Sequence, residues 1–184
     1  MKIGCFNALT DNYIWFIEHE NQIIVIDPGV APPIIDYIEQ HHLTLQAICL
    51  THDHVDHVGG VAALVKQFPA PVYGLGKIAT HPLKNGEILH FSKTISGRIL
   101  FTPGHTDSSL CYLMNIEGSK HLFCGDTLFT AGCGRVFTDD FTSMFHSLNQ
   151  LKELDSNFLV YPGHEYGASQ DTCANGSLRV LNLL

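Results

Sequence analysis

Histidine and aspartate residues recur at four places along the chain, each time within a short motif. The first motif is HxHxDH, at positions 52–57, and the motifs TPGH, CGD and PGH each bring one further residue of the same kind. Imidazole nitrogens and carboxylate oxygens are the ligands that zinc and similar divalent metals prefer in proteins. We therefore predict seven metal ligands, which are His52, His54, Asp56, His57, His105, Asp126 and His164.

The number of these residues bears on the number of metal ions. One ion usually takes three or four protein ligands, so seven residues suit two ions. We expect His52, His54 and His105 to hold one ion, and Asp56, His57 and His164 to hold the other. Asp126 is the natural bridge because a carboxylate has two oxygens. The sequence thus predicts a centre of two divalent ions, with zinc expected and iron or manganese as alternatives.

An apolar, strand-like run precedes every motif. The runs are residues 45–50 before HxHxDH, 98–101 before TPGH, 121–124 before CGD and 157–161 before PGH. Such runs, ended by Gly or Pro, are typical of strands that open into loops. If the carboxyl ends of these strands lie at one edge, the loops bring all seven side chains together. The spacing within HxHxDH is too tight for one helix face to present every ligand, so we predict an irregular loop there.

The other elements are predicted from periodicity and turn signals. The opening segments KIGCF, YIWFIE and QIIVID are expected to form a meander of strands, and residues 32–42 a helix with proline in its first turn. Residues 141–154 give the clearest helix, with apolar residues at i, i+3, i+4 and i+7 that we expect to face the core. Asp27, after the strand QIIVI, could accept an N–H from a ligand histidine, but a cap on the IDPG turn is favoured slightly. Asp53 and Asp107 are expected to face solvent or to cap a turn.

Composition limits the classes of protein to which the chain can belong. Its 184 residues, 45% hydrophobic and 15% charged, predict one globular domain. The formal net charge of −8 disfavours nucleic acid as a partner. No apolar run approaches the ~20 residues that span a bilayer, and the first residues lack the apolar core of a secretory signal. We therefore expect a cytoplasmic location, where the six cysteines are free thiols. They show no CxxC spacing, so neither a structural zinc nor a redox pair is indicated. We also expect a monomer without membrane partners.

Longer motifs around the ligands carry a family resemblance. They are TDNYIW, IDPG, THDHVDHVGG, TPGHT, GDTLFTAGCGR and PGHEY. HxHxDH followed by His, Asp and His identifies the chain as a member of the metallo-β-lactamase superfamily, and the longer motifs resemble glyoxalase II, the hydroxyacylglutathione hydrolases. The resemblance implies an α/β fold, the four-layer αββα sandwich, with the metals at one edge of its sheets. It implies a catalytic domain over residues 1–166. After PGHEY the chain departs from the family, and we expect residues 167–184 to be a short tail in place of the family's C-terminal helical domain.

The resemblance also implies an activity. Members of this family hydrolyse S-D-lactoylglutathione to D-lactate and glutathione. Within the family, Arg135 and Tyr166 match positions that contact the glutathione part of the substrate, and Phe137 matches a neighbouring position that is Tyr in some members. The expected nucleophile is a hydroxide that bridges the two metals, with Asp56 and Asp126 as catalytic ligands. A thiolate leaves readily, since thiols ionise near pH ~8.5, so the reaction needs no dedicated general acid.

Three other functions compete with this hypothesis. A superfamily member could act on another thioester or on a persulfide, but persulfide dioxygenases use one iron, and Asp56, His57 and His164 suit a second ion. A nuclease is disfavoured by the acidic composition. The chain could also be a truncated metal-binding protein with little activity, because the helices that close the substrate pocket are missing.

Overall fold

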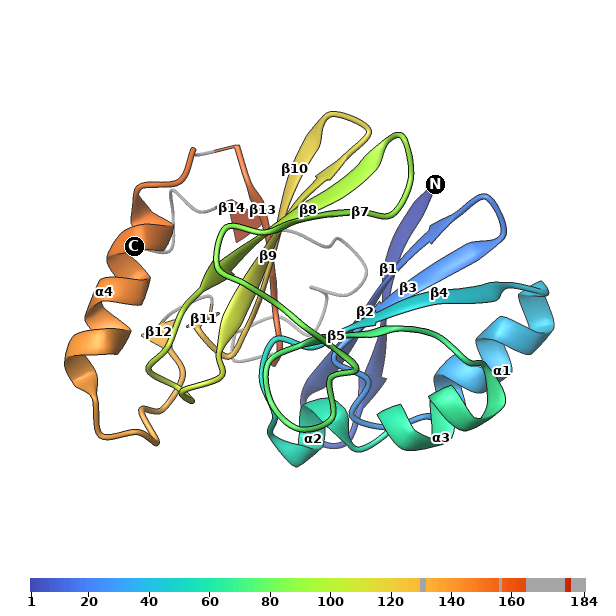
Figure 1. The fold of residues 1–184 in the computed structure, drawn as a ribbon, viewed down its shortest axis with the longest axis horizontal. Coiled ribbons are helices and arrows are strands. Elements are labelled where there is room, and N and C mark those ends of the chain that lie inside the picture. The colour runs from blue at the N-terminus through green and yellow to red at the C-terminus, as the bar shows by residue number, and fades with distance from the viewer. Residues whose placement is uncertain (130–131, 156, 165–177, 180–184) are drawn as a thin grey trace.

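The structure is a computed structural model, which describes residues 1–129, 132–155, 157–164 and 178–179. Two six-stranded sheets form its centre (Figure 1). The first sheet contains, in spatial order, β1 (Lys2–Ala8), β2 (Asn12–His19), β3 (Gln22–Ile26), β4 (Thr44–Cys49), β5 (Val72–Gly74) and β6 (His81–Pro82). The second contains β14 (Leu178–Arg179), β13 (Leu159–Pro162), β10 (Ser119–Gly125), β9 (Leu110–Ile116), β8 (Ile95–Phe101) and β7 (Ile88–His90).

Helices flank the two sheets on opposite sides (Figure 1). α1 (Pro32–His41), α2 (Val55–Val58) and α3 (Val61–Gln67) lie by the first sheet, and α4 (Phe141–Lys152) lies by the second. A short ladder of β11 (Leu128–Phe129) and β12 (Gly132–Cys133) follows β10. None of the helices within the described ranges has the length and apolar character needed to cross a bilayer.

Three apolar clusters correspond to the three interfaces between these layers. Ile14 and Phe16 of β2 pack with α1 and α3 in the first cluster. Trp15 of β2 points to the opposite face, where it joins Phe123 of β10 in the second cluster, between the sheets. Leu122, next to Phe123, belongs to the third cluster, under α4. Because side chains alternate between the faces of a strand, one strand serves two clusters, and the layers follow the predicted αββα order.

Strand direction places the predicted motifs at one edge of the sandwich. β4 runs parallel to β3, and β13 runs parallel to β10. β8 and β10 are both antiparallel to β9, so β8, β10 and β13 point the same way. The loops that follow β4, β8, β10 and β13 carry HxHxDH, TPGH, CGD and PGH. The prediction that strand ends deliver these motifs to one place is confirmed.

Two local predictions are wrong. HxHxDH is not wholly an irregular loop, because its second half forms α2, beginning after the extended residue His54. The apolar residues of α4 do not all face the core: Met144 and Leu151 are buried, whereas Phe141 and Phe145 are 69% and 63% exposed. The polar residue Ser147 is buried in their place, with its hydroxyl donating to the Pro103 carbonyl at 2.7 Å.

The cysteines within the described residues divide into two groups, and Cys173 lies outside those residues. Cys49, Cys111, Cys124 and Cys133 are free, as expected, and the first three are buried. Cys5 is disulfide-bonded, which corrects the expectation of free thiols at that position. Of the predicted tail, residues 167–184, only β14 lies within the described residues.

Candidate metal centre

The first group of predicted ligands consists of three histidines from two loops. His54 Nδ1 lies 3.2 Å from His52 Nε2 and 3.1 Å from His105 Nε2. His52 and His105 are buried, and His54 is partly exposed. Such convergence of ring nitrogens forms a cluster that could hold a metal ion.

The second group combines two histidines with a carboxylate. His57 Nε2 and His164 Nε2 lie 3.2 Å apart, although 107 residues separate them in the chain. Asp56 Oδ2 lies 3.5 Å from His57 Nε2 and 3.4 Å from His164 Nε2. α2 presents Asp56 and His57, and the loop after β13 presents His164.

Asp126 lies between the two groups. Its Oδ2 is 3.5 Å from His105 Nε2 in the first group and 3.2 Å from His164 Nε2 in the second. Its Oδ1 is 3.4 Å from His57 Nε2. The structure thus brings all seven predicted side chains together, with Asp126 in the position expected of a shared ligand.

Hydrogen bonds on the far side of the rings set which nitrogen carries the proton. His57 Nδ1 lies 3.1 Å from Asp27 Oδ2, and His164 Nδ1 lies 2.9 Å from Asp11 Oδ1. His105 Nδ1 lies 2.7 Å from the carbonyl oxygen of Arg135. These oxygens can only accept, so each Nδ1 donates, and the Nε2 lone pair faces the centre.

Asp27 contacts the second group directly and the first group through Thr51. It accepts from the Thr51 backbone N–H at 2.8 Å and from the Thr51 hydroxyl at 2.6 Å. The Thr51 oxygen is in turn 3.1 Å from His52 Nδ1, so Asp27 orients His57 directly and His52 through Thr51. The favoured interpretation of Asp27 as a cap of the IDPG turn is therefore wrong, because its side chain points into the centre.

Divalent cations fit this arrangement of atoms. With both Nδ1 atoms donating outward, His57 Nε2 and His164 Nε2 are two acceptors 3.2 Å apart, which repel unless a cation or a proton lies between them. Asp126 Oδ1 is buried and has no hydrogen-bond partner among the described residues. A buried carboxylate oxygen without a donor is costly, and a metal ion would satisfy it.

The electrostatics differ between the two groups. Burial opposes a charged His164, but contacts with Asp126 and Asp11 outweigh it and raise the pKa to about 9. Burial lowers the pKa of His57, but the hydrogen bond to Asp27 and the charges of Asp27, Asp126 and Asp56 together outweigh burial and raise it. Burial and the neighbouring histidines hold the pKa of His52 well below its usual value, and burial lowers the pKa of His105. The second group thus attracts positive charge strongly, whereas the first offers neutral imidazoles to a metal.

Comparison with known proteins agrees with this geometry. A sequence profile described as the metallo-beta-lactamase superfamily matches residues 9–164. The chain belongs to that superfamily. Within it, the chain is 42% identical to hydroxyacylglutathione hydrolase of Neisseria meningitidis serogroup A (strain Z2491), over 92% of this chain and 68% of the relative. It is 45% identical to hydroxyacylglutathione hydrolase 2 of Vibrio vulnificus (strain YJ016), with the same coverage. These relatives place the chain in the hydroxyacylglutathione hydrolase (glyoxalase II) family.

Solved structures show the same superfamily fold. ETHE1 from Myxococcus xanthus matches with a TM-score of 0.80 and 27% identity, over 98% of this chain and 80% of that one. The protein TTHA1623, solved in a di-iron-bound form, matches with a TM-score of 0.75 and 26% identity, over 94% of this chain and 98% of that one. The metallo-β-lactamase fold, predicted from the motifs, is confirmed.

Two glycines explain how the superfamily motifs of this chain approach one another so closely. A Cβ at Gly163, next to His164, would lie 2.5 Å from Asp126 Oδ1 and 2.7 Å from His57 Cε1. Gly125, next to Asp126, has a φ of +50°, and a Cβ there would collide with the Thr51 side chain. Both loops can pack against the centre only because these positions lack a side chain.

Two of the three predicted substrate residues, Arg135 and Phe137, lie beside the first group. The Phe137 ring is 56% exposed and packs edge to face on His54 and His105, with centroids 5.1 and 5.3 Å away. The exposed Arg135 places its guanidinium carbon 5.1 Å from the centre of the Phe137 ring. Tyr166 lies outside the described residues. Arg135 and Phe137 thus form an exposed cationic and aromatic surface beside the centre.

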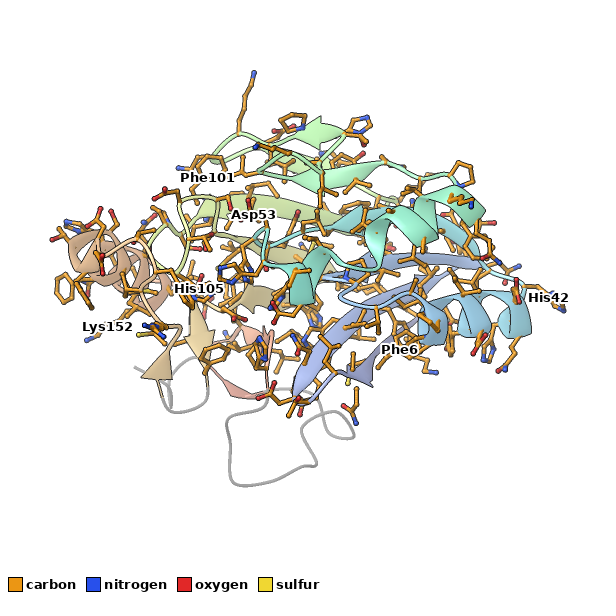
Figure 2. The ribbon with its side chains drawn as sticks, turned by 90° about the horizontal axis from the view of Figure 1, so that it is seen from below. Phe6, His42, Asp53, Phe101, His105 and Lys152 are labelled. Carbon is orange, nitrogen blue, oxygen red and sulfur yellow. The ribbon has the colours of Figure 1, made fainter. Side chains whose placement is uncertain are left out.

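The rim of the centre contains one further contact between loops. In Figure 2, Asp53 and His105 are labelled on the two loops that carry the first group. Asp53 is exposed and accepts a hydrogen bond from the Ser108 hydroxyl at 2.8 Å. This agrees with the expectation that Asp53 faces solvent, and it joins the HxHxDH loop to the TPGH loop.

Two residues near the centre were missed by the sequence reasoning. Asp11 contacts His164, and the side-chain amide of Asn12 donates to Asp56 Oδ2 at 2.9 Å. The signal was present in TDNYIW, whose polar residues precede an apolar strand. This motif gave no indication of the partners of Asp11 and Asn12, because His164 is more than 150 residues away.

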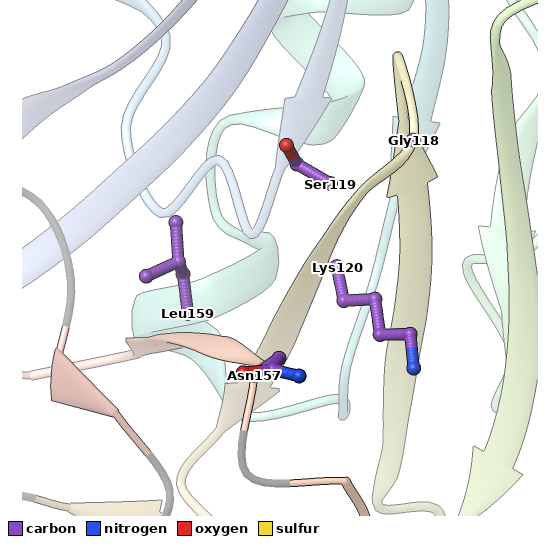
Figure 3. Close-up of a pocket in the computed structure, with 5 residues that line it drawn as sticks. All are labelled: Gly118, Ser119, Lys120, Asn157 and Leu159. Carbon is purple, nitrogen blue, oxygen red and sulfur yellow. The ribbon is translucent and has the colours of Figure 1, made fainter.

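A separate hollow of about 320 Å³ lies away from the centre (Figure 3). Its lining includes Ser119 and Lys120 at the start of β10, whereas Asp126 follows the end of that strand. Lys120 is already paired with Asp155 at 2.7 Å. The hollow therefore offers no group to the chemistry of the centre.

Proposed function

We propose that this chain is a metal-dependent thioester hydrolase that cleaves S-D-lactoylglutathione to D-lactate and glutathione. The observation that carries the proposal is the convergence of two ligand groups on Asp126. The hydroxyacylglutathione hydrolases that the chain resembles over 92% of its length support the choice of substrate.

We propose two divalent ions per chain, zinc first and iron or manganese as alternatives. His52, His54 and His105 would hold one ion. Asp56, His57 and His164 would hold the other, and Asp126 would contact both. When bound, such ions acidify a water molecule and polarise the thioester carbonyl.

Residues around the centre orient the proposed metal ligands. Asp27, Asp11 and the Arg135 carbonyl keep the imidazole N–H groups outward, so that each Nε2 faces the centre. The carboxylates of Asp56 and Asp126 would offset the positive charge of the ions, and these two residues are the proposed catalytic ligands. The side chain of Asp56 is 33% exposed, so solvent reaches the second group at this residue. A thiolate is a stable leaving group, so no proton donor is required.

Arg135 and Phe137 are the proposed contacts for the glutathione part, together with Tyr166. A guanidinium fork suits a carboxylate, and glutathione carries two carboxylates. The exposed position of Arg135 beside Phe137 supports this role. An exposed cation matters all the more on a chain with a formal net charge of −8, which on the whole repels an anionic substrate.

Other parts of the proposal concern the whole chain. We propose that residues 1–166 form the catalytic domain. The monomeric state, the cytoplasmic location and the absence of nucleic-acid and membrane partners stay predictions. Size-exclusion chromatography with light scattering would test the first of these.

The experiment that tests the function is a substrate panel on the full chain loaded with zinc. We expect rapid thiol release from S-D-lactoylglutathione, which is lost in a chelator and restored by zinc. Slow cleavage of the N-acetylcysteamine thioester of D-lactate would show that the glutathione part is recognised. Equal rates on both thioesters would leave a thioester hydrolase without glutathione specificity, and no thiol release from either would refute the proposal.

A further inference from the structure

The start of β2 is attached to the loop that carries His164. The Tyr13 backbone N–H donates to the Gly163 carbonyl at 2.8 Å, and the indole N–H of Trp15 donates to the Pro162 carbonyl at 2.7 Å. Asn12 and His164 also form an isolated antiparallel bridge. This part of the first sheet thus holds the end of β13, which belongs to the second sheet.

Two side chains extend this attachment to the ligands themselves. Asn12 is buried, and its amide N–H₂ donates to Asp56 Oδ2 at 2.9 Å and lies 3.4 Å from His164 Nε2. The same amide lies 3.4 Å from the Asp56 carbonyl oxygen. Asp11 Oδ1 accepts from His164 Nδ1 at 2.9 Å. One short segment therefore orients two of the three ligands of the second group.

The first group is oriented by other parts of the chain. His52 Nδ1 contacts the Thr51 hydroxyl, and His105 Nδ1 donates to the Arg135 carbonyl. Thr51 is next to His52, and Arg135 lies in the segment after β12. The two groups of the centre are thus oriented by different residues, apart from Asp27 and the shared Asp126.

We propose that Asn12 and Asp11 are positioning residues that set the metal affinity of the second group and leave that of the first group unchanged. The proposal rests on the two-ion centre of the proposed function. Asn12 fixes the Asp56 carboxylate so that Oδ2 faces the two imidazoles of its group, and Asp11 fixes the N–H of His164 on the outer nitrogen. Loss of such an outer partner typically weakens metal binding about 10–100-fold.

The test is a zinc titration of the full chain and of the variants Asn12→Leu and Asp11→Ala. Leucine has the branched shape of asparagine and a larger volume, so Asn12→Leu removes the donor without leaving a void. Each protein is stripped with a chelator, dialysed and titrated with zinc alone by calorimetry. We expect the parent chain to bind two ions. Each variant should bind one ion with unchanged affinity and the second about 10–100-fold more weakly.

Asp107→Ala is the matched control. It removes an exposed carboxylate two residues from the ligand His105, and so has a similar effect on the net charge near the centre. We expect it to bind both ions as the parent chain does. A loss of the second ion in this control would show that charge alone, not positioning, sets the affinity, which would overturn the proposal.

The other outcomes are also decisive. Unchanged binding of both ions in the two variants, or equal weakening of both ions, would overturn the proposal, and so would a parent chain that binds a single ion. Asp11 is 36% exposed, so Asp11→Ala keeps the test open if Asn12→Leu fails to fold in a thermal unfolding measurement. The titration needs no substrate. A chain that binds two ions but does not release thiol from S-D-lactoylglutathione would therefore refute the proposed function alone.

Discussion

At the scale of single residues, Asp126 connects the two halves of the centre. One of its oxygens faces a histidine of each group, and the other is buried without a hydrogen-bond donor among the described residues. With any uncharged replacement, the seven-residue set would keep five neutral imidazoles and only one carboxylate to offset the charge of two dications. The proposed chemistry therefore depends on this residue more than on any single histidine.

Replacement of Asp126 is the first prediction at this scale. Asp126→Ala should lower kcat/KM for S-D-lactoylglutathione more than about 100-fold. A loss of about 100-fold is the upper range when the missing residue only hydrogen-bonds to a metal ligand. Metal content, measured by atomic emission on the same sample, should fall below that of the parent chain. Asp107→Ala serves as the control and should retain activity. Unchanged turnover in Asp126→Ala would rule out the two-metal mechanism.

The second prediction concerns Arg135, which is exposed and lies over the Phe137 ring. If its guanidinium only binds the substrate, Arg135→Ala should raise KM and leave kcat nearly unchanged. Steady-state kinetics with S-D-lactoylglutathione measure both constants. Arg98→Ala, at an exposed arginine of β8, is the matched control for the loss of one positive charge. An equal loss in kcat and kcat/KM would show instead that Arg135 acts in the transition state.

The sequence predicted the metal ligands better than the residues that orient them. His52, His54 and His105 lie in motifs whose residue types indicate metal binding. Asp27 was ambiguous, because an acid after a strand can cap a turn as well as orient a histidine. Asp11 and Asn12 could not be assigned, since only the pairing of β2 with the loop after β13 brings them to His164 and Asp56.

At the scale of elements, four strand ends and one short helix build the centre. Parallel strands in the second sheet bring TPGH, CGD and PGH to one edge, and α2 turns Asp56 and His57 toward them. The apolar runs before each motif predicted this arrangement. The helix was not predicted, because four residues are too few to show a helical period.

The amphipathic pattern of α4 shows a second limit. Five apolar residues at helical spacing predicted a core-facing stripe, yet Phe141 and Phe145 are largely exposed. The buried side of α4 instead includes Ser147, whose hydroxyl donates to a backbone carbonyl of the TPGH loop. Periodicity gives the width of an apolar stripe but not the angle at which the sheet meets it.

The third prediction tests the close approach of the motif loops. Gly163→Ala should place a methyl group against Asp126 Oδ1 and His57 Cε1. Overpacking of this kind typically costs about 1–3 kcal/mol, and here it should also displace ligands. We expect a lower free energy of unfolding in urea and weaker zinc binding. Gly132→Ala is the control, because a Cβ there has open space around it. Parent-like zinc binding in Gly163→Ala would show that the loops need not pack so tightly.

At the scale of the whole molecule, the centre joins two sheets that the apolar clusters hold face to face. Asp11 and Asn12 lie at the start of β2 in the first sheet, while Asp126 and His164 lie after β10 and β13 of the second. Metal binding is therefore expected to couple to the stability of the whole sandwich, because ions that bind only the folded chain stabilise it.

The fourth prediction is a pH dependence of the stability of the metal-free chain. Burial opposes protonation of His164, but Asp126 and Asp11 raise its pKa from the ordinary 6.5 to about 9. Protonation of a group whose pKa is raised in the folded chain stabilises the folded state. This stabilisation is fully present below pH 6.5 and is lost as the pH rises through about 9. His57, whose pKa is also raised, acts in the same direction.

Urea denaturation of the chelator-treated chain should thus show a free energy of unfolding that falls between pH 6.5 and 9. His164→Gln should flatten this slope, because the group that loses its proton is gone. The zinc-loaded parent chain should not show the same fall, since the metal replaces the proton. A metal-free chain whose stability is constant across this range would contradict the assigned contacts of His164.

The central claim is that the chain hydrolyses the thioester at a centre where side chains from both sheets would hold two divalent ions. The most direct measurement adds zinc stepwise to the chelator-treated chain and records bound zinc and thiol release from S-D-lactoylglutathione on the same samples. We predict no thiol release without zinc and full activity when two ions are bound. Full turnover by the metal-free chain, or no turnover with both ions bound, would contradict the account.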